Sequence, residues 1–193
     1  IVVDEAVAEA FVERFVARAG QIRATDPRAK DAQLGAMITE QAAQRVRAMV
    51  SDAVSKGASL ALEGRNEGVF VDPVILDHVR PGMRVYEDEC FGPLASIIRV
   101  AGDDEAVTVA NDTEYGLAAA VFSRDVTRAL RVARRLETGI CHINGATIQD
   151  EPQMPFGGVK ASGYGRFGGR SGIEAFTELR WITIAENRPH YPF

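Results

Sequence analysis

Two stretches of this chain combine residue types and spacings that could do chemistry. The first is Glu89-Cys90-Phe91-Gly92-Pro93, which lies directly before an apolar run that begins at Leu94. A carboxylate can accept hydrogen bonds from both hydroxyls of a ribose, and an aromatic ring two residues further on can pack against the adjoining ring. An ordinary turn with a solvated glutamate explains the same residues more simply. The pentapeptide alone therefore leaves both interpretations open.

The second stretch is rich in glycine and runs from Gly157 to Gly172. Its residues 163–168 match the pattern G-x-G-x-x-G. A dinucleotide-binding fingerprint needs a strand directly before that pattern, a helix after it and an acidic residue about 20 positions on, whereas a polar stretch containing Pro152 and Pro155 precedes it here. A phosphate loop is excluded because Lys160 does not follow the second glycine of the required pattern. The glycines are instead predicted to permit positive φ angles in a tight loop.

Neither cysteine has the surroundings of a nucleophile. Cys90 follows three acidic residues, 87–89, which would raise the pKa of its thiol and disfavour the thiolate. Cys141 lies in an apolar strand and is predicted to be a buried structural thiol. The adjacent His142 is predicted to be a core histidine with its hydrogen bonds satisfied, and Trp181 to lie in the core or an interface. We therefore expect no catalytic residue among them.

Composition narrows the class of protein. The 193 residues are 46% hydrophobic and 25% charged, as in a soluble globular domain. The net charge of -5 argues against a nucleic-acid or membrane-surface binder, and no apolar run approaches the roughly 18 residues that span a bilayer. Two cysteines and three scattered histidines provide no disulfide framework and no metal site. A cytoplasmic location is expected.

The elements that position these stretches follow from capping residues and apolar spacing. Helices are predicted after four capping positions: Asp4, Thr39 (to about Gly57), Asp103 or Asp104 (to about Asn111), and Asp125. A short further helix is predicted over 172–176. Strands are predicted over residues 1–3, 94–100, 118–122, 139–144 and 177–184, with one or two more over 58–76, where Pro73 indicates an edge strand or a bend. The remainder is read as loops over 24–38, 77–93 and 145–172.

Strands and helices that alternate at this length are typical of βαβ units. The expected fold class is therefore α/β, a parallel-rich sheet flanked by helices.

The motifs also occur in a recognisable order. They are Ile1-Val2-Val3, Leu34-Gly35 with Ile38, Glu89–Pro93 as E-x-F-G-P, Asn111 with Tyr115–Ala119 and Val121-Phe122, Gly139–Asn144 as G-x-x-x-x-N, and Pro155–Arg166 as P-F-G-G-x-K-x-S-G-x-G-R. This ordered set resembles the aldehyde dehydrogenase superfamily along essentially the whole chain. Residues 139–144 and 153–156 look most like members that act on aromatic aldehydes such as salicylaldehyde, vanillin or benzaldehyde.

The resemblance implies roles for particular residues. Glu89 and Phe91 would contact the nicotinamide ribose and ring of NAD or NADP. The aldehyde pocket would be lined by Ile148, Gln149, Asp150 and Phe156. The glycine-rich stretch would be a structural loop near the site, and His142 stands where many relatives have an aromatic residue.

The resemblance also implies a division of the molecule. Residues 1–176 would be part of the catalytic domain, and residues 177–193 a terminal strand and tail used in a homo-oligomer, either dimer or tetramer. The family's nucleophilic cysteine, general-base glutamate, oxyanion asparagine and Rossmann domain would lie before Ile1, so the 193 residues alone are expected to be inactive. A stand-alone binding or regulatory module, or a structural oligomerisation partner, remains the alternative.

Overall fold

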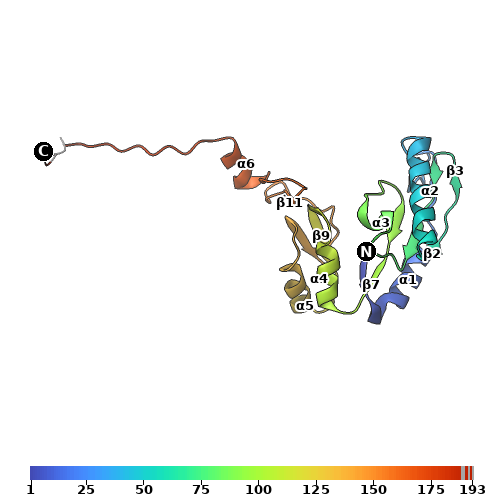
Figure 1. The fold of residues 1–193 in the computed structure, drawn as a ribbon. Helices are drawn as coiled ribbons and strands as arrows, with labels where there is room; N and C mark the ends of the chain where they lie inside the picture. Colours follow the sequence, from blue (N-terminus) through green and yellow to red (C-terminus); the bar gives the residue numbers. More distant parts are fainter. Residues whose placement is uncertain (188–189, 191, 193) are drawn as a thin grey trace. The chain divides into compact units, whose positions relative to one another are not determined.

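The structure is a computed structural model that describes residues 1–187, 190 and 192, and it forms two compact units, Ile1–Thr113 and Glu114–Phe193 (Figure 1). The first unit contains β1 (Val2–Asp4), α1 (Glu5–Ala19), α2 (Glu40–Ser55), β2 (Ser59–Leu62), β3 (Asn66–Glu67), β4 (Phe70–Val71), β5 (Val74–Asp77), α3 (Arg84–Glu87), β6 (Leu94–Ser96), β7 (Ile98–Val100) and α4 (Asp103–Asn111). Parallel strand pairs and helices make the chain α/β, as predicted.

Side-chain caps start the two long helices of the first unit. The Asp4 carboxylate accepts the Ala6 amide at 3.0 Å, and the Thr39 hydroxyl accepts the Ala42 amide at 3.1 Å, which confirms both predicted caps. The predicted cap of α4 was wrong. Its N-cap is Gly102, at φ 86°, so the aspartates at 103 and 104 lie in the first turn, where their charge complements the helix dipole.

The strands of the first unit form three separate sheets, β1 with β7, β2 with β5 and β6, and β3 with β4. β5 lies between β2, which is antiparallel to it, and β6, which is parallel; β7 instead pairs in parallel with β1. Ile97 separates β6 from β7, and its backbone bonds Leu76 and Val79. The single strand predicted over 94–100 is therefore divided, because its two halves pair with different neighbours. Pro73 lies between β4 and β5, and because β5 has a partner on both sides it is not an edge strand.

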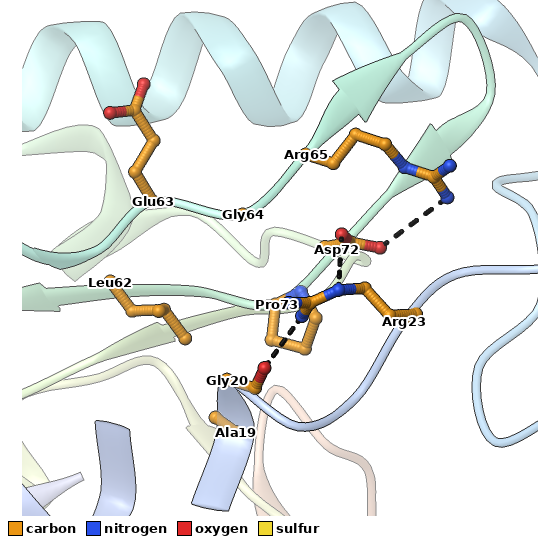
Figure 2. Close-up of a pocket in the computed structure, with 9 residues that line it drawn as sticks. All are labelled: Ala19, Gly20, Arg23, Leu62, Glu63, Gly64, Arg65, Asp72 and Pro73. Carbon is orange, nitrogen blue, oxygen red and sulfur yellow. Dashed lines mark hydrogen bonds and ion pairs between the residues drawn. The ribbon is translucent and has the colours of Figure 1, made fainter. Parts of the chain in front are cut away.

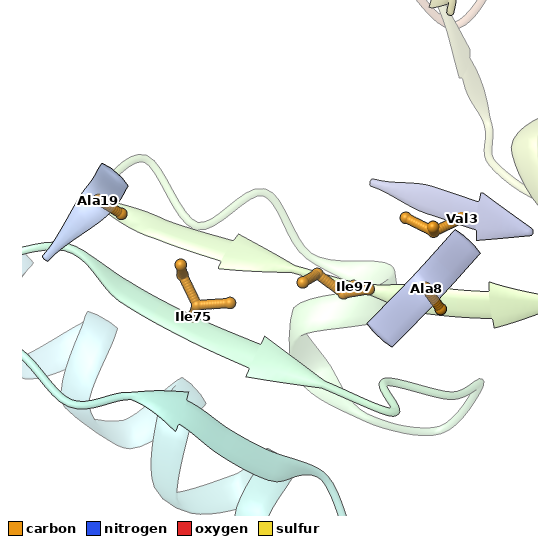
Figure 3. Close-up of a cluster of buried hydrophobic side chains, with 5 residues drawn as sticks. All are labelled: Val3, Ala8, Ala19, Ile75 and Ile97. Carbon is orange, nitrogen blue, oxygen red and sulfur yellow. The ribbon is translucent and has the colours of Figure 1, made fainter. Parts of the chain in front are cut away.

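The buried core of this unit gathers around β5 and Ile97. Figure 3 shows Ile75 and Ile97 together with Val3 of β1 and with Ala8 and Ala19 of α1. Phenylalanines 11 and 15 of α1 stack with ring centroids 5.6 Å apart and pack against this cluster. The face of α1 that covers the strands comprises Ala8, Phe11, Val12, Phe15 and Val16, which follow helical spacing, whereas Val7 is 57% exposed.

The second unit is a small βαβ arrangement with a long loop. It contains β8 (Tyr115–Gly116), β9 (Ala118–Val121), α5 (Val126–Ala133), β10 (Ile140–Ile143), β11 (Val159–Lys160) and α6 (Gly169–Ala175). β9 and β10 are parallel, and α5 connects them with Ala129 fully buried. Asp125 caps α5 by accepting the Arg128 amide at 3.0 Å, as predicted. β8 and β11 form a separate antiparallel pair.

The end of the chain differs from its prediction. Residues 177–184 form no strand, and α6 occupies 169–175 instead of 172–176. Trp181 is 91% exposed, so it is not in the core of this chain. A strand requires a neighbour for its backbone groups, and none of the described residues provides one for this segment. Part of the predicted tail after residue 187 lies outside the described residues.

Candidate functional site

The turn Glu89–Pro93 connects α3 to β6 and presents two side chains to solvent. Glu89 is exposed, and the Phe91 ring is 75% exposed. Phe91 adopts φ 51°, in the left-handed region that costs a non-glycine residue roughly 1–2 kcal/mol. Since such a conformation persists only where neighbouring contacts impose it, the contacts that hold this turn define the site.

A side chain of α2 holds the middle of the turn. The Arg45 guanidinium donates from Nη2 to the Cys90 carbonyl oxygen at 2.7 Å. The Cys90 side chain, like those of Met37 and Leu94, packs against the buried cluster of Ala43, Val46 and Val71. Arg45 was not predicted from the sequence, because the residues around it give no indication of a contact with a turn 45 positions later.

Gly92 allows the backbone of this turn to lie very close to α2. A Cβ atom at this position would lie 2.6 Å from Cγ2 of Val46 and 3.3 Å from Cε of Met37. The Val46 side chain is itself fully buried, so it has little space into which to move. The glycine of the E-x-F-G-P motif is therefore required here by close approach to the helix.

Helix α3 is anchored just before the turn. The Arg84 amide donates to Asp52 of α2 at 2.9 Å, and the Tyr86 hydroxyl donates to Asp112 at 2.6 Å. Burial, and then the hydrogen bond to Asp112, raises the pKa of Tyr86 to about 12, so its hydroxyl remains a donor at neutral pH. After the turn, the Pro93 carbonyl accepts the Val74 amide at 2.8 Å. The turn is therefore fixed at both ends.

The thiol of Cys90 is not activated. Burial raises its pKa, and the charge of Arg45 opposes this only partly. The prediction of a raised pKa is confirmed, but the main cause is burial and not the acidic residues 87–89. A raised thiol pKa lowers the thiolate fraction at neutral pH.

In the second unit, the four residues assigned to an aldehyde pocket lie on the loop between β10 and β11. Ile148 is 91% exposed, and Gln149 and Asp150 are also exposed. Phe156 is less exposed, at 37%, and its backbone forms an antiparallel bridge with Phe167. The loop thus presents three residues near its tip and anchors the fourth at its base.

The glycine-rich stretch builds the scaffold of this loop. Ser162 accepts the Gly116 amide at 3.0 Å, and Arg166 Nη1 donates to the carbonyls of Gly158 and Gly165 at 2.8 and 2.6 Å. A Cβ at Gly139 would collide with the Gly157 carbonyl. Positive φ angles occur, as predicted, at Gly163, Gly165, Gly168 and Gly169.

Two predictions for strand β10 were wrong. Cys141 is exposed and not buried. Its pKa is nevertheless raised by the partial burial of the thiol. Nε2 of His142 is buried and has no hydrogen-bond partner among the described residues, so this histidine is not satisfied as predicted.

A pocket of about 140 Å³ in the first unit contains none of the predicted site residues (Figure 2). Its buried carboxylate already has partners: Asp72 accepts the Ala24 amide at 2.7 Å and lies 3.7 and 3.8 Å from the guanidiniums of Arg23 and Arg65. Ligand pockets are usually about 300–1,000 Å³. The ion pairs in this pocket therefore serve to fix the loop before α2.

Within the part of the chain that the structure describes, no three histidine, cysteine or acidic side chains are grouped so as to hold a metal ion. None of the described helices is both long and apolar enough to cross a membrane.

Comparison with known proteins agrees with the motifs. The sequence model of the aldehyde dehydrogenase family matches residues 1–182. A vanillin dehydrogenase of Pseudomonas fluorescens is 50% identical over 100% of this chain and 40% of its own length. A benzaldehyde dehydrogenase [NAD(+)] of Pseudomonas putida is 39% identical over 97% of this chain and 39% of its own length.

A solved structure matches the fold as well. The crystal structure of a salicylaldehyde dehydrogenase from Pseudomonas putida G7, complexed with salicylaldehyde, superposes with a TM-score of 0.91 at 45% identity, and the match covers 100% of this chain and 40% of that one. The chain therefore belongs to the aldehyde dehydrogenase family. It spans about 40% of the length of the relatives that it matches.

Proposed function

We propose that the complete enzyme oxidises an aromatic aldehyde to the carboxylic acid with NAD or NADP. The observation that carries this proposal is the anchored turn 89–93, in which Glu89 and Phe91 are both exposed while Arg45 of α2 and the amide of Val74 in β5 hold the backbone. It is supported by relatives whose names specify vanillin, salicylaldehyde and benzaldehyde as substrates.

The turn suits a nicotinamide nucleotide. The carboxylate of Glu89 is free to accept hydrogen bonds from two ribose hydroxyls, and the open ring of Phe91 can pack against a planar ring. When bound, the cofactor supplies the acceptor for hydride. Glu89 and Phe91 are then the groups that fix its position, and a bound geometry close to the reactive one contributes a large part of the rate.

The loop between β10 and β11 suits an aldehyde pocket. We assign Ile148, Gln149, Asp150 and Phe156 to its wall. An apolar isoleucine and an aromatic ring would pack against an aromatic substrate, and the amide and carboxylate would contact polar substituents on that ring. The scaffold of Arg166 and Ser162 holds the base of this loop.

The nucleophile of the proposed reaction is neither cysteine of these 193 residues. Cys90 packs against α2, and the pKa values of both thiols are raised by burial. We propose that the nucleophile, the oxyanion donors and the general base are contributed by other parts of the complete enzyme. A covalent mechanism needs a thiolate within reach of the aldehyde carbon, and the raised pKa of each thiol disfavours that form, even with Arg45 close to Cys90.

We further propose that the enzyme is a homo-oligomer located in the cytoplasm. Four large apolar residues are exposed near the end of the chain: Leu179, Trp181, Ile182 and Ile184. A second copy could pair with this segment as a strand and bury them. Both cysteines are free thiols, which suits a reducing compartment. In sedimentation velocity, Trp181→Glu should release smaller species; an unchanged sedimentation coefficient would contradict the role of this segment.

The substrate proposal is tested by steady-state kinetics of the complete enzyme with vanillin, salicylaldehyde, benzaldehyde and a short aliphatic aldehyde, each with NAD and with NADP. We expect kcat/KM to be at least about tenfold higher for the aromatic aldehydes, the effect of about 1.4 kcal/mol of extra transition-state binding. Ile148→Asp should reduce that preference. Equal kcat/KM values for aromatic and aliphatic substrates would contradict the aromatic assignment, and no oxidation of any aldehyde would contradict the function itself.

A further inference from the structure

We propose that Arg45 is a positioning residue of the nicotinamide site, which it serves by holding the Cys90–Phe91 peptide of the turn 89–93. The inference rests on the proposed role of Glu89 and Phe91. The observation behind it is the 2.7 Å hydrogen bond from Arg45 Nη2 to the Cys90 carbonyl oxygen.

This hydrogen bond controls the conformation of the turn through the peptide that it holds. The Cys90 carbonyl belongs to the peptide that joins Cys90 to Phe91, so the bond restrains ψ of Cys90 and φ of Phe91 together. Phe91 has φ 51°, an angle that a phenylalanine rarely adopts without restraint. Rotation of this one peptide would redirect the Phe91 ring and, through Cys90, the carboxylate of Glu89.

The other contacts of the turn do not hold this peptide: the hydrogen bonds from the amides of Val74 and Leu94 end on the later carbonyls of Pro93 and Gly92. Gly92 presses on Val46 and the Cys90 side chain packs on the same cluster, but both are apolar contacts that do not select one orientation of the peptide. Hydrogen bonds are directional, and this one comes from a charged donor on a regular helix. Arg45 lies on α2 next to Val46, so the same helical turn provides the apolar platform and the hydrogen bond.

The helix also provides a matched control. Arg47 lies two residues further along α2 and donates from Nη1 to Asn66 Oδ1 of β3 at 2.6 Å. Arg47→Ala therefore removes an arginine hydrogen bond from the same helix without touching the turn. Arg45→Lys keeps one charged donor near the carbonyl and should restore part of the effect.

The first measurement is hydrogen exchange of the complete enzyme without cofactor, followed in peptides that cover residues 88–94. We expect Arg45→Ala to speed exchange in this segment, Arg47→Ala to leave it unchanged, and Arg45→Lys to give an intermediate rate. Equal exchange in Arg45→Ala and wild type would overturn the proposal. This readout does not depend on activity or on the identity of the cofactor.

The second measurement is the dissociation constant of NAD and the single-turnover rate of reduction. We expect Arg45→Ala to raise the dissociation constant about tenfold, the effect of losing one hydrogen bond to a charged donor, and Arg47→Ala to change it little. A raised dissociation constant with unaltered exchange would overturn the positioning role, because Arg45 would then act on the cofactor directly.

Glu89→Ala separates this inference from the proposed function. If Glu89→Ala weakens NAD binding and Arg45→Ala does not, the positioning role fails and the nicotinamide site stands. If Arg45→Ala loosens the turn but neither variant affects NAD, the nicotinamide assignment fails and, with it, the role of Arg45 in that site.

Discussion

The Arg99 guanidinium binds the Asp77 carboxylate at two points, with Nε 3.1 Å from Oδ1 and Nη2 2.6 Å from Oδ2. Asp77 ends β5 and is only 4% exposed, and Arg99 lies in β7. The third nitrogen of the guanidinium, Nη1, bonds Glu9 of α1 at 2.5 Å. One side chain therefore connects two strands and the helix that covers them.

Removing Arg99 should destabilise the protein strongly. Arg99→Met leaves the buried Asp77 carboxylate without its charged partner, and breaking such a pair costs about 3–5 kcal/mol. Urea unfolding of the purified protein measures the loss. The double variant Asp77→Leu with Arg99→Met removes both charges and should recover part of it. A single variant within about 0.5 kcal/mol of wild type would contradict the account of this pair.

The same carboxylate should make the stability sensitive to acid. Burial tends to raise the pKa of Asp77, but the hydrogen bonds from Arg99 and from the His78 amide outweigh it, so the pKa is lower in the folded than in the unfolded chain. A lowered folded pKa contributes stability that is present above the unfolded value, about 3.9, and lost as the pH falls through the folded value. Asp77→Asn should therefore flatten the unfolding free energy below about pH 4. An identical slope in both proteins would contradict this.

Gly92 should be coupled to Val46. Gly92→Ala places a Cβ 2.6 Å from Val46 Cγ2, and forcing an extra methyl into a packed site typically costs about 1–3 kcal/mol. Val46→Ala removes the obstructing methyl groups, so the double variant should be more stable than the sum of the single losses predicts. A double-mutant cycle from denaturant unfolding gives this coupling energy, and strict additivity would contradict the close contact.

The elements that the sequence predicts best are those that depend on local chemistry. Asp4, Thr39 and Asp125 cap their helices as predicted, because an N-cap needs only a short oxygen-bearing side chain and the two or three residues that follow. Gly102 was missed because two good capping residues follow it directly, and a glycine can start a helix by its backbone alone.

Features that depend on distant partners were predicted less well. The division of strand 94–100 at Ile97 arises because its halves pair with β5 and β1, which no pattern within the strand indicates. The strand expected over 177–184 needs a partner that this chain does not provide. The residues of the turn 89–93 were predicted from their motif. The role of Arg45 was not predicted, because only the fold brings α2 beside the turn.

Asn144 should be hard to replace at the end of β10. Its side chain accepts the Ser123 amide at 2.9 Å and donates to the Ser123 carbonyl at 3.0 Å, while its own φ is 56°. Asn144→Ala loses both hydrogen bonds and strains the backbone, with an expected cost of about 2–4 kcal/mol. Asn144→Gly relieves only the strain and should recover about 1 kcal/mol. Thermal unfolding compares the three proteins, and an alanine variant as stable as the glycine variant would contradict the strained backbone.

The most direct test of the central claim is the single-turnover rate of hydride transfer in the complete enzyme, followed by the absorbance of reduced nicotinamide after rapid mixing with an aromatic aldehyde. If Glu89 positions the cofactor, Glu89→Ala should slow this step by about tenfold or more, while Glu87→Ala, which changes an acidic residue just before the turn, should not. A Glu89→Ala rate equal to that of wild type would contradict the assignment of the turn 89–93 to the nicotinamide site.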